Sequence, residues 1–80
     1  MGQLLFKYKS GNTYYNKKAN YAQFTDMIKS MNDRGQKVEI LKQIKTKDGE
    51  IPLEIKAHYP SEIIDIEYIP NKGELDESNL

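Results

Sequence analysis

Hydrophobic and polar residues alternate in four segments of the chain, which span residues 4–8, 38–45, 51–57 and 63–69. A repeat of two residues is typical of a β-strand that has one face on a core and the other in solvent. Residues 13–18 follow the first segment after a short turn and are predicted to return beside it. The pattern therefore predicts a sheet of five strands that is mostly antiparallel.

The first two strands are joined by Ser10-Gly11-Asn12-Thr13, and Gly-Asn between two such segments favours a two-residue turn of type I′ or II′. Ser10 would then lie opposite Thr13. This register predicts a core-facing set formed by Leu4, Phe6, Tyr8 and Tyr15. The solvent-facing set would be Lys7, Lys9, Tyr14, Asn16 and Lys18.

One helix is predicted, from Tyr21 to about Asp33. Asn20 is a favourable N-cap, and Gln23 stands at the position that completes a capping box. Gly35 supplies the left-handed residue that often follows the end of a helix. One apolar stripe with spacings of three and four residues is formed by Tyr21, Phe24, Ile28 and Met31, with Met27 beside it.

A central hairpin is predicted over residues 37–57. Matching its hydrophobic faces puts Ile44 opposite Leu53, with either Asp48-Gly49 or residues 47–50 as the loop. Pro52 has no N–H and cannot join a hydrogen-bonded pair, so the four-residue loop is the one predicted. The core residues expected under the helix are Ile40, Ile44, Leu53 and Ile55.

The last strand is predicted to pair with the hairpin so that Ile66 lies opposite Ile55. The order β-β-α-β-β-β then describes an α+β fold, with a single helix packed on one face of a mostly antiparallel sheet. Residues 1–70 are expected to form one domain. Residues 71–80 are acidic and poor in apolar side chains, and we interpret them as a disordered tail.

Composition limits the classes of function. There is no cysteine, and no apolar segment approaches the roughly 18 residues of a membrane span, so a cytoplasmic protein is expected. The net charge is zero, which is unusual for a dedicated nucleic-acid binder. The many Lys, Ile, Asn and Tyr residues are typical of an AT-rich genome, such as that of a low-GC bacterium or its phage.

Catalytic motifs are missing from the sequence, which has no P-loop, no G-x-S-x-G and no H-E-x-x-H. His58 is the single histidine and lies in a short connection, where a surface role is expected. Asp65 and Glu67 share one face of the last strand, and we interpret them as a solvated face paired with lysines. No catalytic residue, cofactor or metal ligand is predicted.

Two surfaces remain as candidates for binding. The sheet face away from the helix carries Leu41, Ile63 and Ile69, which could contact a protein partner or a second copy of the chain in a homodimer. An exposed edge strand could also accept a strand from a partner. The N-terminal hairpin combines lysines with a tyrosine, as single-stranded nucleic-acid binders do, through Lys7, Lys9, Tyr14, Lys17 and Lys18.

The sequence thus favours a small non-enzymatic binding or regulatory module that acts through protein–protein contacts. An accessory protein of a phage or mobile element would fit this description. The alternative is a nucleic-acid-binding module that uses the basic N-terminal hairpin. No membrane association is expected.

Overall fold

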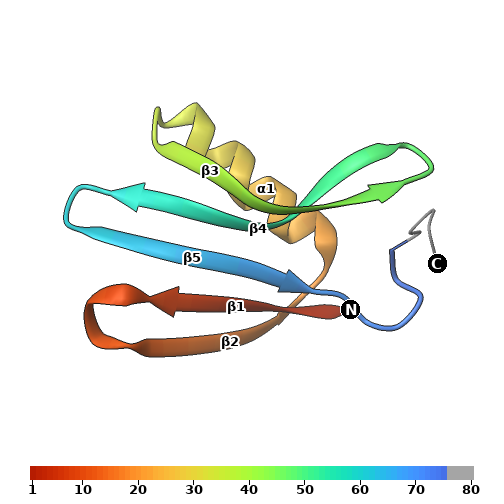
Figure 1. Ribbon diagram of the computed structural model, residues 1–80, viewed down its shortest axis with the longest axis horizontal. Helices are drawn as coiled ribbons and strands as arrows, with labels where there is room; N and C mark the ends of the chain where they lie inside the picture. The colour runs from red at the N-terminus through yellow and green to blue at the C-terminus, as the bar shows by residue number, and fades with distance from the viewer. Residues whose placement is uncertain (76–80) are drawn as a thin grey trace.

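The computed structural model describes residues 1–75 and shows one five-stranded antiparallel sheet with a helix behind it (Figure 1). The strands stand in the order β2-β1-β5-β4-β3. The predicted α+β class and the order of elements are therefore confirmed. The elements are β1 (Gly2–Tyr8), a 3₁₀ turn η1 (Lys9–Gly11), β2 (Thr13–Ala19), α1 (Tyr21–Asp33), β3 (Lys37–Thr46), β4 (Gly49–Tyr59) and β5 (Glu62–Ile69).

Helix α1 begins and ends as its sequence predicts. The Asn20 side chain accepts a hydrogen bond from the Gln23 N–H at 2.8 Å, and the Gln23 side chain accepts one from the Asn20 N–H at 2.8 Å. At the other end Gly35 has a φ of 75°. Its N–H donates to the Asn32 carbonyl at 2.9 Å, which closes the last turn.

The core lies between α1 and the sheet. Helix residues Phe24 and Met31 are fully or almost fully buried, as the apolar stripe predicts. They pack on buried side chains from the sheet, which are Leu4, Leu53, Ile55, Ala57, Ile66 and Tyr68. Ile55 pairs with Ile66, so the predicted register between β4 and β5 is confirmed.

The register of the first hairpin differs from the predicted one by two residues. Tyr8, not Ser10, lies opposite Thr13, and the connection contains η1 and a left-handed Asn12. A contact with a distant strand favours this connection, since the Ser10 hydroxyl donates to the Glu62 carboxylate at 3.0 Å. The two faces are preserved by a shift of two, but Tyr15 is 54% exposed instead of buried.

The loop of the central hairpin is also shorter than predicted, with Thr46 opposite Gly49 and only Lys47 and Asp48 between them. The Thr46 hydroxyl accepts from the Asp48 N–H and donates to the Gly49 carbonyl at 2.7 Å. The constraint from Pro52 is nevertheless met. Pro52 lies opposite Gln43, which is a non-hydrogen-bonded position when the pairs are counted from this turn.

Strands β3 and β4 pair with Ile44 opposite Ile51 and Ile40 opposite Ile55, not with the predicted partners Leu53 and Ala57. The register shifts on both sides of Lys42, which marks β-bulges in this pair. Ile40 is 52% exposed, so its predicted place in the core is wrong. Its strand is one of the two edge strands of the sheet, and the bulges bend it (Figure 1).

Tyr68 connects four parts of the molecule. Its ring lies 5.3 Å from Tyr21 and 5.9 Å from Phe24, measured between centroids. Its hydroxyl accepts from the Gly2 N–H at 3.1 Å and lies 3.3 Å from the Ala19 carbonyl oxygen. Burial, together with the hydrogen bond to a nearby carboxylate, raises the pKa of Tyr68 to about 12. The hydroxyl is therefore neutral at physiological pH.

That carboxylate belongs to Glu74, which accepts a hydrogen bond from Tyr68 and another from the Asn71 N–H. Burial by itself raises the pKa of Glu74, but these hydrogen bonds outweigh it and the pKa is lowered. Leu75 packs against the core. Residues 71–75 of the predicted tail thus contact the domain, whereas residues 76–80 lie outside the described part of the chain.

We predict that Tyr68→Phe lowers the free energy of unfolding by about 1–3 kcal/mol, because the Gly2 N–H and the Glu74 carboxylate each lose a partner. Urea denaturation at neutral pH measures the change. Tyr59→Phe is the matched control, since Tyr59 is half-buried against the same core. An equal loss in the two variants would contradict the role given to the Tyr68 hydroxyl.

Candidate functional site

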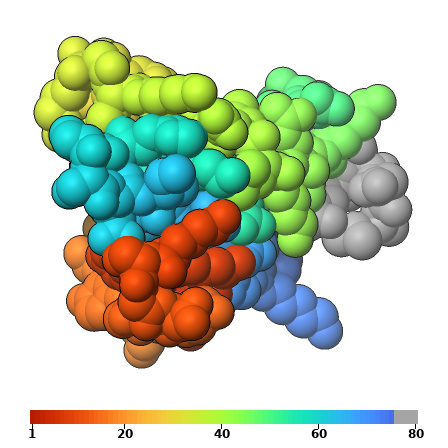
Figure 2. Space-filling model, turned by 60° about the vertical axis from the view of Figure 1, so that its left-hand side comes forward, coloured from red at the N-terminus to blue at the C-terminus, as the bar shows by residue number. Residues whose placement is uncertain are grey.

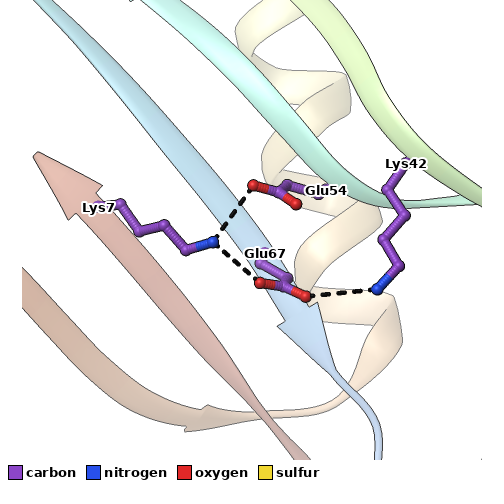
Figure 3. A network of polar contacts seen from close by, with 4 residues as sticks. All are labelled: Lys7, Lys42, Glu54 and Glu67. Carbon is purple, nitrogen blue, oxygen red and sulfur yellow. Dashed lines mark hydrogen bonds and ion pairs between the residues drawn. The ribbon is translucent and has the colours of Figure 1, made fainter. Parts of the chain in front are cut away.

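The sheet face away from α1, called the open face below, carries a network of charges at its centre (Figure 3). The Lys7 ammonium lies 3.3 Å from a Glu54 carboxylate oxygen and 3.1 Å from one of Glu67. Lys42 lies 3.7 Å from the second oxygen of Glu67. Strands β1, β5, β4 and β3 each contribute one side chain, so the network crosses most of the sheet.

Lys7 holds two carboxylates that would otherwise repel each other. Glu54 and Glu67 are direct cross-strand partners, and like charges in such positions are destabilising. The hydrogen bond to Glu67 is the largest cause of a raised pKa for Lys7, partial burial opposes it, and the contacts with Glu54 add to the rise. The centre of the open face is thus neutralised internally.

The three apolar residues predicted on the open face do not form one patch. Ile63 and Ile69 lie at opposite ends of β5, with Asp65 and Glu67 between them on the same face. Leu41 lies in the bulged region of β3, on the far side of β4. All three are exposed, by 39% to 44%. Their role in an interface stays a prediction, and they do not form one continuous apolar patch.

Of the five residues of the predicted basic surface, Lys7, Lys9 and Tyr14 line one hollow, whereas Lys17 and Lys18 are not among its lining residues. Tyr14 and Lys18 lie on the open face, whereas Lys17 lies opposite Leu4 and therefore on the helix side of β2. Lys9 is in the turn η1. Lys7 is engaged by the two glutamates. The other three lysines of the hairpin thus lie apart, with Lys9 in the turn, Lys17 on the helix side of β2 and Lys18 on the open face.

A hollow of about 340 Å³ lies beside this hairpin and is lined by Lys7, Tyr8, Lys9, Asn12, Tyr14 and Asp65. Tyr14 is 66% exposed at its rim. One oxygen of Asp65 is buried without a hydrogen-bond partner. A carboxylate in this position attracts a donor group and repels a phosphate, so the hollow is poorly suited to an anion.

His58 lies beside one acidic residue of β3. The His58 Nε2 atom lies 3.2 Å from a Glu39 carboxylate oxygen, on the β3 side of the open face. The Lys37 ammonium next to Glu39 lowers the pKa of that carboxyl group, against a smaller opposing effect of burial. Among residues 1–75, no group of three or more histidine and carboxylate side chains could hold a metal ion.

Strand β2 holds Tyr14, Lys17 and Lys18 of the predicted basic surface, but its place at an edge of the sheet was not predicted. Six of its seven residues are exposed, and β1 is its neighbour on one side while no described element covers the other (Figure 1). Its register with β1 is continuous from Thr13 to Ala19, without a bulge. The two edge strands can be identified only when the strand order is known, which explains why the sequence did not predict that β2 is one of them.

No family model, curated protein or solved structure matches this chain. Within the described residues, no helix is long and apolar enough to cross a membrane. The binding surface must therefore be inferred from the geometry alone.

We predict that Lys7→Met lowers the free energy of unfolding by about 1–2 kcal/mol at about pH 7, because Glu54 and Glu67 then face each other without the lysine. The loss should shrink below about pH 4, where carboxylates become protonated. In the unaltered chain, the raised pKa of Lys7 means that the charged lysine stabilises the fold fully at pH values below the ordinary lysine pKa. The contribution is lost as the pH rises through the folded-state value.

Denaturation of the variant and the parent chain across this pH range measures the difference. Lys29→Met is the control, since Lys29 is an exposed residue on the helix. A loss that does not change between neutral and acidic pH would contradict the electrostatic explanation.

Proposed function

We propose that this chain is a small non-enzymatic binding or regulatory module that acts through protein–protein contacts, with β2 as its docking strand. The observation that carries the proposal is the state of this edge. It is a regular strand with an uncovered side, and tyrosines stand on both of its faces. Backbone N–H and C=O groups on an uncovered edge are ready to pair with a strand from a partner.

The side chains of β2 support the same proposal. Tyr14 is 66% exposed on the open face, and Tyr15 is 54% exposed on the helix side, where its ring lies 5.9 Å from that of Phe6. Tyrosine is enriched at protein interfaces because a large rigid ring carries a polar group. A strand added beside β2 would cover part of both rings.

The opposite edge is less suited to accept a strand. Strand β3 contains the bulges next to Lys42, and bulges interrupt the regular ladder that a partner strand needs. Four of its ten residues are charged, namely Lys37, Glu39, Lys42 and Lys45. The proposal therefore assigns docking to β2 and a protected edge to β3. Cytoplasmic location and origin in a phage or mobile element are parts of the proposal that rest on composition.

A second candidate function is the binding of single-stranded nucleic acid at the same hairpin. The exposed ring of Tyr14 beside Lys9 favours it, because a base can stack on tyrosine while lysine neutralises a phosphate. It takes second place because Asp65 lines the same hollow and two glutamates neutralise Lys7.

The protein-contact proposal predicts that a photo-crosslinking amino acid at position 15 captures a protein, whether a second copy or another chain. The same amino acid at position 50, in the exposed turn region of β4, is the control. Mass spectrometry identifies each crosslinked chain. Capture at position 15 that is no stronger than at position 50 would remove β2 as the docking strand.

The nucleic-acid alternative makes a different prediction. Binding of a single-stranded oligonucleotide should weaken steeply with salt and fall about tenfold in Tyr14→Ala. Fluorescence anisotropy at low and physiological salt measures both effects. Lys29→Ala, on the helix, should leave binding unchanged. If the parent chain does not bind at low salt, the alternative is removed.

A further inference from the structure

We infer that the partner of β2 is a second copy of this chain, which pairs antiparallel with Asn16 opposite Asn16 of the partner copy. The two sheets would then join into one sheet of ten strands across a two-fold axis. This inference rests on the proposed function and specifies its partner. It is carried by the sequence of β2, TYYNKKA, which is complementary to itself when it is read in the opposite direction.

The pairing places each tyrosine opposite a lysine. With Asn16 on the axis, Tyr14 faces Lys18 of the other copy on the open face, and Tyr15 faces Lys17 on the helix side. A lysine ammonium over a tyrosine ring is an attractive contact, and its aliphatic part packs on the ring. The two-fold axis repeats both contacts, so four such pairs surround the central asparagines.

Backbone geometry allows this register and limits the others. Alternate residues of β2 turn their N–H and C=O groups towards β1, and the residues between them turn these groups outwards. In a two-fold pairing, even-numbered residues must therefore lie opposite even-numbered residues, and odd-numbered residues opposite odd-numbered ones. The Asn16 register satisfies this condition and pairs all seven residues of the strand. A slip by two residues puts either Tyr15 or Lys17 opposite its own copy and shortens the ladder at both ends.

Electrostatics also favours this register over the slip towards the C-terminal end. In that slip the two Lys17 side chains face each other, and like charges in direct cross-strand positions repel. In the Asn16 register no lysine of β2 faces another lysine. Figure 2 shows the N-terminal hairpin, in red and orange, at the lower border of the molecule.

One strand pair is a small interface, since stable dimers commonly bury about 800 Å² on each partner. The dimer should therefore be weak and depend on concentration. Sedimentation equilibrium of the full chain up to about 300 µM is expected to show monomers and dimers in exchange. A strict monomer over this range would overturn the inference. It would leave the proposed function standing if crosslinking at position 15 captures another protein.

A disulfide test reports the register directly, and the chain has no cysteine of its own. Paired Cα atoms in antiparallel strands lie about 4.5–5.5 Å apart, which is within the span of a disulfide. Under mild oxidation Asn16→Cys should form a covalent dimer at least about tenfold faster than Lys18→Cys or Glu50→Cys. Equal rates in the three variants would overturn the register.

A charge exchange tests the same contacts without a covalent bond. Tyr14→Lys puts a lysine opposite Lys18 of the other copy and should weaken the dimer about tenfold. Adding Lys18→Glu to it puts opposite charges in these positions and should restore the dimer to within about threefold of the parent chain. Circular dichroism confirms that each variant folds. A double variant no tighter than Tyr14→Lys would overturn the pairing, and the cysteine test stands if a charge variant fails to fold.

Discussion

The fold depends most on one buried tyrosine, through the packing of its ring and the hydrogen bonds of its hydroxyl group. The ring of Tyr68 packs between Tyr21 and Phe24, so that it joins β5 to the helix. Its hydroxyl reaches the backbone of Gly2 and Ala19, which lie at the start of β1 and the end of β2. Burying a hydroxyl group without hydrogen-bond partners destabilises the fold. The Gly2 N–H supplies one partner, and this requires a close approach of the chain at Gly2. A Cβ atom at position 2 would lie only 2.6 Å from that hydroxyl, so glycine is required there.

The charged residues are arranged so that the basic N-terminal half of the chain contacts the acidic C-terminal half. Residues 1–40 hold seven basic and three acidic residues, and residues 41–80 hold five and nine. Lys7 from the basic half lies between Glu54 and Glu67 from the acidic half. The contact neutralises the centre of the open face, and the lysines that remain accessible on the hairpin are those of β2 and its turn. Charge thus distinguishes the border of the sheet from its middle.

The helix, the assignment of residues to faces and the register between β4 and β5 could be predicted from the sequence, whereas the registers of β1 with β2 and of β3 with β4 could not. A capping box and an apolar stripe are local signals, and both are realised around Asn20 and Phe24. A repeat of two defines the face of a strand but is unchanged by a slip of two residues. The observed register of the first hairpin is favoured by the contact between Ser10 and Glu62, which are 52 residues apart. The bulges beside Lys42 likewise have no local signal in the sequence, whereas Ile63 and Ile69 lie apart because six positions along one strand separate them.

The two edge strands of the sheet differ, and this difference determines how many chains can join by strand pairing. Strand β2 is regular, while β3 is bent by bulges and carries four charged residues. Pairing of β2 with β2 would use the regular border of both copies at once. Each outer border of the joined sheet would then be a bulged β3, which offers a poor template for a third copy. Growth by strand addition would therefore stop at two chains and would not continue into a fibre.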